Sequence, residues 1–338
     1  MDSKGVNMFE KELDVGQQAV LEAVRLSRTI QKELTREDCL IKKDKSPVTI
    51  ADFAAQAIVC RILSEHFPAL PIVGEERADA LKKPEHREIL EKVLYYLEKD
   101  EKTRKILNRE NLFRCIDMGS AEPSNQVFWT LDPVDGTKGF LRGEQFAVAL
   151  ALVVEGKVRL GILGCPNLTL PHRQSDQGYL LWAVKGQGTR LMNIESSEIE
   201  HTGVSKLTDS AEMRFVESYE SGHSDQDMQL RIARELNMER DPVRLDSQVK
   251  YAIVATGNAE IYLRIPNPHT PDYREKIWDH AAGSLIVEEA GGVVTDIYGK
   301  KLDFGKGRTL DNNSGILVSI PSLHDRVLEI IKDLAPTR

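Results

Sequence analysis

Apolar residues recur at helical spacing in the first hundred residues of the chain. Leucine, isoleucine and valine side chains fall on one face of a helix expected from about residue 10 to residue 35, and a second helix is expected from about residue 49 to residue 64. Between residues 89 and 97 the same spacing occurs among many charged residues. This pattern predicts surface helices over one edge of the fold, and it leaves open whether they act as a lid or are a plain insertion.

The middle of the chain changes to short, continuous apolar runs, which are typical of buried strands. Phe146–Val154 and Val158–Leu163 are two such runs, and residues 155–157 join them. They predict a β-hairpin in a buried sheet, which the run Tyr179–Val184 extends.

From about residue 202, short strand and helix patterns alternate. The expected elements are Phe215–Glu217, Gln226–Leu236, Val249–Thr256 and Glu260–Arg264. At 338 residues the chain exceeds the size at which single hydrophobic cores stop growing, so we expect two lobes. We place an N-terminal α+β lobe at residues 1–200 and a C-terminal α/β lobe at residues 201–338.

Composition narrows the classes of function. Hydrophobic residues make up 41% of the chain and charged residues 29%, which is ordinary for a globular protein. A net charge of −8 disfavours a nucleic-acid polymer as partner, because such partners normally meet a basic surface. The sequence contains neither an apolar run of membrane-helix length nor an N-terminal targeting pattern. We therefore expect a cytosolic protein without a membrane partner, and a monomer fits the sequence.

The segment Trp129–Thr137 carries the most informative chemistry. An apolar strand pattern here leads into a tight turn that holds two carboxylates, Asp132 and Asp135, which are oxygen ligands of the kind that Mg²⁺ prefers. A proline between them stiffens the turn, so that the carbonyl of Val134 is expected to point inward as a third ligand. The hydroxyl of Thr137 is placed to orient a water molecule. Alone, such a segment is more often a simple turn.

Two further acidic segments follow apolar runs. Residues 71–74 predict a short buried strand that ends at Glu75, and Asp279 stands just before an alanine-rich helix pattern. Taken singly, Glu75 would be read as a solvated loop acid and Asp279 as a helix N-cap. Together with Trp129–Thr137, these segments form a Gly-Glu-Glu, an Asp-Pro-Val-Asp-Gly-Thr and a Trp-Asp motif in that order. This combination resembles the magnesium-dependent, lithium-sensitive phosphomonoesterase superfamily of inositol monophosphatase.

Within that superfamily the chain resembles the 3'(2'),5'-bisphosphate nucleotidases. The segments that carry this likeness are Lys138–Val148, Ser221–Ser224, Leu245–Tyr251, Ile261–Arg264 and Leu302–Leu310. The likeness covers almost the whole chain, except the charged stretch from about residue 79 to residue 125. It implies a layered αβαβα sandwich, with most metal ligands in the N-terminal lobe and the nucleotide pocket and the last metal ligand in the C-terminal lobe.

The resemblance also implies roles for single residues. It assigns Glu75, Asp132, the carbonyl of Val134, Asp135 and Asp279 as ligands of two to three Mg²⁺ ions. Clustered carboxylates repel one another, so such a site should need divalent cations. Thr137 and Asp52 would orient and deprotonate the attacking water. Asp52 also ends a capping-box pattern that begins at Thr49, which requires no catalytic role.

The nucleotide pocket is assigned in the same way. The resemblance places Gly222, His223, Ser224, Ser247, Lys250 and Arg264 there, with Thr137 also touching the substrate. Lys250 and Arg264 would pair with the phosphate that is not cleaved. Without the motifs, each of these cations would be read as a surface charge and His223 as a loop residue. Lys306 stands in a glycine-rich segment that lacks the spacing of a phosphate loop, so a turn is expected there.

The resemblance implies hydrolysis of 3'-phosphoadenosine 5'-phosphate (PAP) to AMP and phosphate as the activity, with its 5'-phosphosulfate relative PAPS as a further expected substrate. Metal-activated water would attack the phosphorus directly. The alternative is an inositol polyphosphate 1-phosphatase, which shares the metal site but differs in the pocket. A function of a different class is that of a non-catalytic nucleotide sensor. Such a binding protein would have no evident use for so many clustered acidic residues.

Overall fold

The computed structural model describes residues 9–33, 39–41, 47–101, 103–104, 108–123, 126–171, 173, 175–219, 226–267 and 273–334. The helices in this part of the chain are α1 (Glu10–Glu33), α2 (Ile50–His66), α3 (Arg87–Lys99), α4 (Arg109–Asp117), α5 (Thr137–Leu141), α6 (Gln226–Glu235), α7 (Val249–Ala255), α8 (Ala281–Glu289) and α9 (Pro321–Leu334). The strands of the first half are β1 (Cys39–Ile41), β2 (Pro47–Thr49), β3 (Ile72–Gly74), β4 (Val127–Asp135), β5 (Ala147–Val154), β6 (Lys157–Cys165) and β7 (Tyr179–Val184). Those that follow are β8 (Thr189–Asn193), β9 (Ile199–Thr202), β10 (Phe215–Glu217), β11 (Val243–Arg244), β12 (Ile261–Arg264), β13 (Val293–Thr295) and β14 (Ile316–Ser319).

Two larger sheets organise the chain. Strands β3 to β9 form a seven-stranded sheet in sequence order, in which β3 and β4 are parallel and the later neighbours are antiparallel. The second sheet has the order β11-β10-β12-β14-β13 and mixes parallel and antiparallel pairs. Strands β1 and β2 form a separate antiparallel pair.

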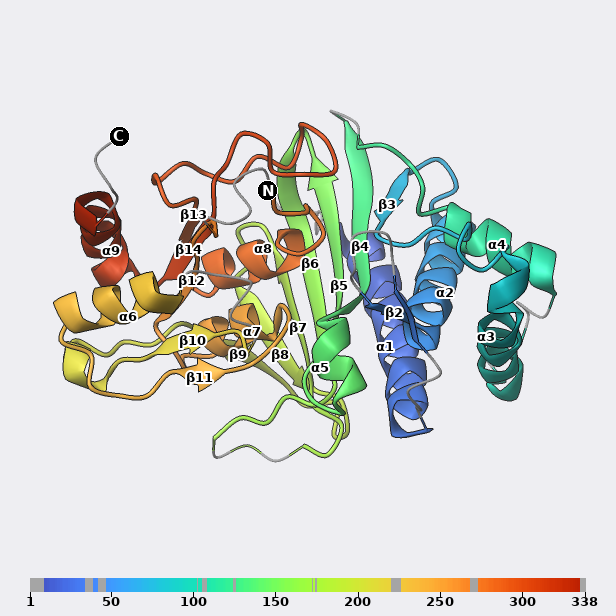
Figure 1. Cartoon of the computed structure of the whole chain (residues 1–338), viewed down its shortest axis with the longest axis horizontal. Helices are drawn as coiled ribbons and strands as arrows, with labels where there is room; N and C mark the ends of the chain where they lie inside the picture. Colours follow the sequence, from blue (N-terminus) through green and yellow to red (C-terminus); the bar gives the residue numbers. More distant parts are fainter. Residues whose placement is uncertain are drawn as a thin grey trace, which may run out of the picture.

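Helices and sheets alternate as five layers, which can be followed from right to left in Figure 1. One hydrophobic core lies between helices α1 and α2 and the seven-stranded sheet. A second core joins the other face of that sheet, helices α7 and α8, and the five-stranded sheet. A third lies between the five-stranded sheet and helices α6 and α9. The expected αβαβα sandwich is therefore confirmed.

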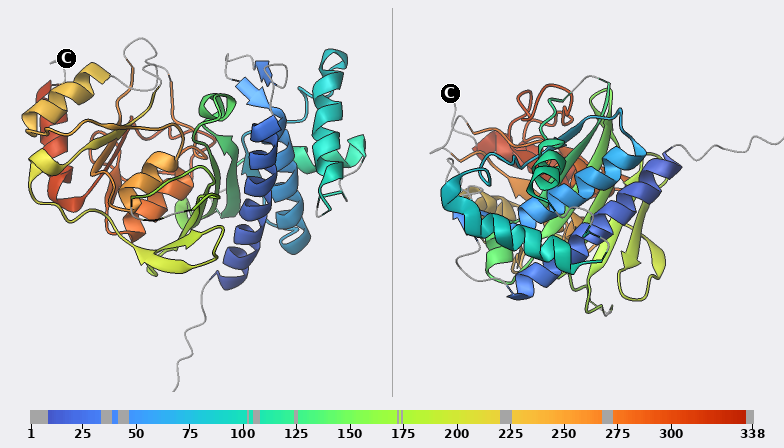
Figure 2. Two further views of the ribbon diagram at one scale, coloured as in Figure 1. Left: turned by 90° about the horizontal axis from the view of Figure 1, so that it is seen from below. Right: turned by 90° about the vertical axis from the view of Figure 1, so that its right-hand side faces the viewer.

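The elements expected from the hydrophobic pattern are also confirmed. Helices α1 and α2 and the β5–β6 hairpin lie within a few residues of their expected bounds, and β7 extends the sheet as expected. Helices α3 and α4 pack against α2 and cover the outer end of the molecule (Figure 2). Each has an apolar side and a charged side, which fits the expected surface helices. The division at residue 200 stays a prediction.

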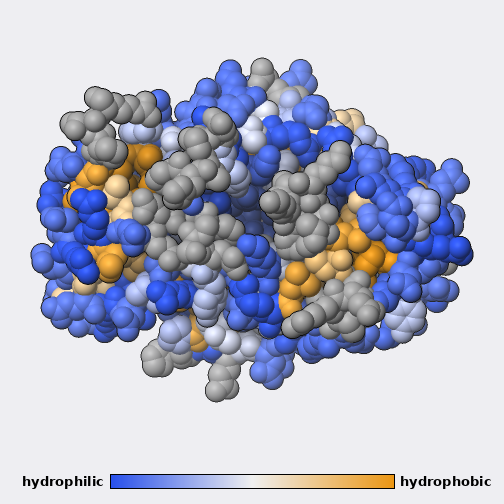
Figure 3. All heavy atoms as spheres, viewed as in Figure 1, coloured by the Kyte–Doolittle hydropathy of each residue, from blue (hydrophilic) through white to orange (hydrophobic). Residues whose placement is uncertain are grey.

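The surface, the helices and the thiols add three observations. On the face shown in Figure 3 the middle of the molecule is mostly hydrophilic, and apolar patches lie toward both ends. Among the described helices, none combines the length and the apolar character needed to cross a bilayer. All four cysteines are free thiols, and three of them are buried.

Strand β6 lies between helices on both faces, and two glycines permit this close packing. A Cβ atom added to Gly161 would lie 2.7 Å from the carbonyl oxygen of Ala282 in α8. A Cβ atom added to Gly164 would lie 2.4 Å from a methyl carbon of Val24 in α1. Because α8 begins directly after the Asp279 segment, the Gly161 contact helps to set how deep this segment sits against the sheet.

We expect Gly161→Ala to lower the free energy of unfolding by about 1–3 kcal/mol, because the added methyl group overpacks the contact with the α8 backbone. Urea unfolding followed by circular dichroism measures this change. Gly203→Ala is the matched control, since the nearest atom to its added Cβ is 3.4 Å away. Equal stability of the two variants would contradict the proposed role of Gly161.

Candidate active site

The ends of two neighbouring strands bring the first carboxylates together. Gly74 of β3 pairs in parallel with Leu131 of β4, and the backbone N–H of Glu75 donates to the carbonyl of Leu131 over 3.1 Å. Because β3 and β4 run in parallel with Gly74 opposite Leu131, Glu75 and Asp132 follow these paired residues and are neighbours across the two strands. The strand expected before Glu75 is thus confirmed.

The segment of the expected metal ligands Asp132 and Asp135 differs locally from the tight turn that the sequence suggested. Strand β4 continues to Asp135, with a bulge that lets Asp132 pair with Ala149 and Asp135 with Ala147. Within the bulge, the N–H of Val134 donates to the Asp132 carboxylate over 3.1 Å. Expecting a turn from Asp132 onward was wrong, because an irregular strand end is enough to aim both carboxylates.

The chain reverses at Gly136 and then starts helix α5. Gly136 has φ 87°, in the left-handed region that favours glycine, and a Cβ atom there would lie 2.8 Å from the Cβ of Ser247. The hydroxyl of Thr137, the first residue of α5, donates to the carbonyl of Val134 over 3.2 Å. This close approach places Ser247, from the far part of the sequence, directly against the carboxylate motif.

Asp279 enters the site from the C-terminal part of the chain. Helix α8 starts after it, but the N-cap residue is His280, so the N-cap interpretation of Asp279 was wrong. The side chain of Gln248 fixes the segment, since its Nε2 donates to the carbonyl of Trp278 over 2.8 Å and its Oε1 accepts from the N–H of Gly283 over 3.1 Å. The backbone N–H of Gln248 also donates to the carboxylate of Asp135.

Gln248 therefore joins the segments that carry Asp135 and Asp279, two expected metal ligands, a role that the sequence gave no reason to assign. It stands inside the segment Leu245–Tyr251, whose resemblance to relatives was noted without a role for this residue. Its side chain is 1% exposed and both of its polar atoms are used.

The electrostatics of the site reflect uncompensated negative charge. Burial, followed by repulsion from Glu75, Asp135 and Asp279, holds the pKa of Asp132 well above its usual range. Burial, followed by repulsion from Asp135 and Glu75, also raises the pKa of Asp279 well above its usual range. Burial raises the pKa of Asp135 to about 6, although Lys250 and the N–H of Gln248 oppose this rise. The charges of Glu75, Asp132, Asp135 and Asp279 therefore act on one another within one buried region.

Asp52 lies near this cluster and also caps a helix. Its Oδ2 accepts hydrogen bonds from the N–H and the hydroxyl of Thr49, each over 2.7 Å, which completes the capping box at the start of α2. Its charge also contributes to the raised pKa of Asp132. The capping interpretation is confirmed, and the catalytic role of Asp52 stays a prediction.

Two cations expected in the substrate pocket lie beside the carboxylates. Lys250, in the first turn of α7, is 3% exposed, and its Nζ lies 3.4 Å from the carbonyl oxygen of Leu245 and 5.3 Å from the centre of the Tyr262 ring. Burial lowers the pKa of Lys250 to about 8, while the attraction of Asp135 opposes this change. Arg264, at the end of β12, pairs with Glu275 over 3.0 Å.

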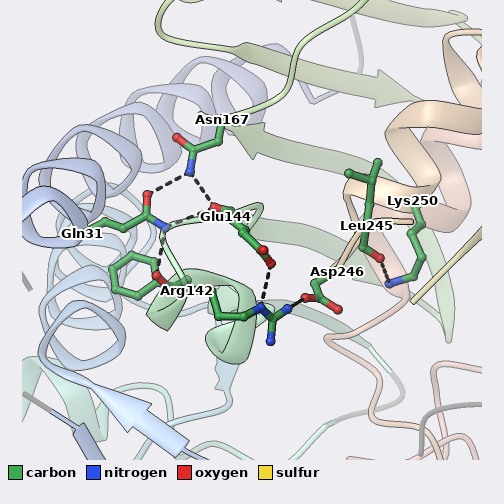
Figure 4. Close-up of polar contacts among 8 residues, drawn as sticks. Gln31, Arg142, Glu144, Asn167, Leu245, Asp246 and Lys250 are labelled. Carbon is green, nitrogen blue, oxygen red and sulfur yellow. Dashed lines mark hydrogen bonds and ion pairs between the residues drawn. The ribbon is translucent and has the colours of Figure 1, made fainter. Parts of the chain in front are cut away.

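Figure 4 shows how the segment before Lys250 is tied to the segment after the carboxylate motif. Arg142 follows helix α5 and bonds to Asp246 and, over 2.7 Å, to Glu144. On the other side, Gln31 of α1 donates to the carbonyl of Glu144 over 3.1 Å. The Arg142–Asp246 pair therefore connects helix α5, which starts at Thr137, with the loop that carries Ser247 and leads into α7.

A buried polar chain that the sequence did not indicate lies behind Asp279. The hydroxyl of Tyr251 bonds to Nδ1 of His280 over 2.7 Å, and Nε2 of His280 bonds to Glu275 over 3.0 Å. Glu275 continues this chain to Arg264. Gly222, His223 and Ser224 lie outside the described residues, so their assignment stays a prediction.

The residues present fit a divalent cation. Carboxylate and carbonyl oxygens are the donors that Mg²⁺ prefers. Burial and mutual repulsion both raise the pKa values of Asp132 and Asp279, and a bound cation would offset this repulsion. Glu75, Asp132, Asp135, Asp279 and the carbonyl of Val134 could hold such ions.

Comparisons with known proteins agree with this geometry. Residues 10–335 match the model of the inositol monophosphatase family. The chain is 41% identical to a 3'(2'),5'-bisphosphate nucleotidase of Schizosaccharomyces pombe over 336 residues, which cover 95% of each protein. It is also 41% identical to a 3'(2'),5'-bisphosphate nucleotidase of Oryza sativa over 350 residues, which cover 98% of this chain and 97% of the relative.

Solved structures extend the comparison to the fold. The IMPase of Thermotoga maritima superposes with a TM-score of 0.66 at 22% identity, covering 96% of this chain and 98% of that one. The suppressor protein SuhB of Bartonella henselae gives a TM-score of 0.65 at 21% identity, covering 96% of this chain and 100% of that one. By its family match and its full-length likeness to these relatives, the chain belongs to the inositol monophosphatase family and, within it, to the 3'(2'),5'-bisphosphate nucleotidases.

Proposed function

We propose that this protein is a magnesium-dependent phosphatase that hydrolyses PAP to AMP and phosphate, and PAPS to adenosine 5'-phosphosulfate. The observation that carries the proposal is the buried Lys250 beside the four-carboxylate cluster. A bisphosphate needs one site for the phosphate that is cleaved and a cationic anchor for the phosphate that is kept. The names of the two relatives described above point to the same class of substrate.

The proposed cofactor is two to three Mg²⁺ ions, held by Glu75, Asp132, Asp135, Asp279 and the carbonyl of Val134. When bound, Mg²⁺ ions neutralise the phosphate oxygens and lower the pKa of water. The chain itself contributes fixed geometry, because the β4 bulge and the Gln248 hydrogen bonds position these ligands before substrate arrives.

Thr137 and Asp52 are proposed to handle the attacking water. The Thr137 hydroxyl donates its hydrogen bond to the carbonyl of Val134. Its oxygen lone pairs can therefore accept a hydrogen bond from water. Asp52 would take the water proton. The water oxygen then bonds to phosphorus, the bond from phosphorus to the 3'-oxygen breaks, and the sugar oxygen gains a proton.

Ser247, Lys250 and Arg264 are proposed to bind the nucleotide. Ser247 lies against Gly136, and this contact supports a pocket next to the carboxylate motif. Lys250 and Arg264 would pair with the retained phosphate. Arg264 would then share its charge between that phosphate and Glu275. We also propose that the protein is a monomer and acts in the cytosol. Size-exclusion chromatography tests the monomeric state.

The test is phosphate release from PAP, inositol 1,4-bisphosphate and inositol 1-phosphate side by side, with Mg²⁺ and with or without millimolar Li⁺. We expect dominant turnover of PAP that Li⁺ suppresses. Dominant turnover of an inositol phosphate would be consistent with the proposed metal ligands but would overturn the assignment of Ser247, Lys250 and Arg264 to a nucleotide pocket. No turnover of any substrate, together with tight PAP binding, would favour the nucleotide sensor.

A further inference from the structure

Strand β3, which ends at Glu75, lies at the edge of the seven-stranded sheet and has only three residues. Its outer side is covered by a short segment in which Ser120 pairs with Val73 and the N–H of Ala121 donates to the carbonyl of Ile72 over 3.2 Å. So short a strand has few ladder bonds of its own to hold the Glu75 carboxylate in place against its acidic neighbours.

Arg308 binds the end of this strand from the C-terminal part of the chain. Its Nη2 donates to the carbonyl of Gly74, the residue directly before Glu75, and its Nη1 donates to the carbonyl of Ala121 over 3.0 Å. One guanidinium thus joins β3 to its covering segment. Its planar fork of donors suits two carbonyls at once, which a lysine ammonium on a flexible stem does not match.

The same guanidinium contacts the segment that carries Asp279. It lies over the ring of Trp278, 4.8 Å from the ring centre, and the backbone carbonyl of Arg308 accepts from the N–H of Ile277 over 3.2 Å. Thr309 pairs with Lys276 next to this bond. Arg308 therefore touches both residues that directly precede an expected metal ligand, Gly74 before Glu75 and Trp278 before Asp279.

Repulsion between the carboxylates opposes this arrangement. Glu75 and Asp279 come from segments about two hundred residues apart, and each carboxylate raises the free energy of placing another beside it. A side chain that binds both segments offsets this repulsion without occupying the site itself. Arg308 belongs to the segment Leu302–Leu310, whose likeness to the nucleotidases had suggested no role for the arginine.

We infer that Arg308 is a positioning residue that holds the strand end carrying Glu75 against the Trp278–Asp279 segment and so sets the affinity of the site for divalent cations. This inference rests on the metal ligands proposed above. It does not depend on which phosphate ester is the substrate.

The test is Mn²⁺ binding to the metal-free, full-length protein by isothermal titration calorimetry, with no substrate present. We expect Arg308→Met and Arg308→Lys each to weaken Mn²⁺ binding by roughly 10-fold or more, because residues that orient metal ligands typically have effects of that size. The Mg²⁺ concentration for half-maximal activity should rise in parallel. The KM for PAP at saturating Mg²⁺ should change by less than about twofold, since Arg308 does not touch the proposed pocket.

Arg326→Met is the matched control, because Arg326 lies on α9 with its side chain about half exposed, and it pairs over 3.1 Å with Glu329 of the same helix, far from the carboxylate segments in sequence. It should leave Mn²⁺ affinity unchanged. Full Mn²⁺ affinity in Arg308→Lys would overturn the inference. A positive charge without the planar guanidinium donors would then be enough to maintain Mn²⁺ binding. If Arg308→Met does not fold, Arg308→Lys decides the matter, because it keeps the charge. Failure of the protein to hydrolyse PAP would refute the proposed function but would leave the calorimetric result interpretable.

Discussion

Asp132→Asn is expected to lower kcat/KM for PAP by on the order of 10³-fold or more, because metal ions supply several kcal/mol of transition-state stabilisation and this carboxylate is a central ligand. The same change should make the metal-free protein more stable. Asp132 is 2% exposed and is repelled by Glu75, Asp135 and Asp279, so removal of its charge should raise the free energy of unfolding by about 1–3 kcal/mol near pH 7.5.

The sign of the pH dependence follows from the raised pKa of Asp132. A carboxyl with a raised pKa in the folded state favours folding at low pH and loses that contribution as the pH rises through its folded pKa. The stability gain of Asp132→Asn should therefore be largest at neutral pH and should shrink as the pH falls toward about 4. Urea unfolding in the presence of a chelator, repeated across this pH range, measures it.

Asp296→Asn is the matched control, because Asp296 is equally buried but is satisfied by hydrogen bonds. Its Oδ1 accepts from the N–H groups of Tyr298 and Lys300, each over 2.9 Å, and its Oδ2 accepts from Asn313 over 3.2 Å. Loss of these charged acceptors should destabilise the protein by about 1–3 kcal/mol and leave turnover by the folded enzyme unchanged. If Asp132→Asn also destabilised the metal-free protein, strong uncompensated repulsion at the site would be ruled out.

Lys250→Met is expected to lower kcat/KM for PAP by about 10- to 150-fold, which corresponds to the loss of one charge-assisted hydrogen bond worth about 1.5–3 kcal/mol. The effect should be small for adenosine 3'-monophosphate, which lacks the retained 5'-phosphate. Methionine has nearly the length of lysine and suits a buried position, so the variant should fold. Steady-state kinetics with both substrates at saturating Mg²⁺ separate the two effects.

Lys306→Met provides the control for a general loss of positive charge. Lys306 is exposed in a glycine-rich turn, and its segment was interpreted as a turn and not as a phosphate loop. Its replacement should leave the kinetics with both substrates unchanged. Equal losses for the two substrates in Lys250→Met would refute an anchor for the retained phosphate, and would point instead to a role of Lys250 in balancing the charge of Asp135.

The sequence determined the local elements because their signals are local. The continuous apolar runs of β5, β6 and β7 have few alternatives once a sheet is covered on both faces. The capping pattern at Thr49 likewise fixed the start of α2. The four carboxylates were found through motifs, since a short ligand segment keeps its spacing along the chain.

The tertiary structure decided the features that depend on contacts between distant segments, which residue spacing along the chain does not indicate. The bulge in β4 depends on pairing with β5, and His280 replaced Asp279 as N-cap because the backbone of that segment is fixed by Gln248. The role of Gln248 arises partly from the hydrogen bond of its backbone N–H to the Asp135 carboxylate, and the role of Arg308 from hydrogen bonds to the carbonyls of Gly74 and Ala121. Each of these partners lies more than a hundred residues away along the chain. Such contacts depend on how the sheets and helices pack and leave no periodic signal in the sequence, so only the folded chain reveals which polar side chains hold the ligands in place.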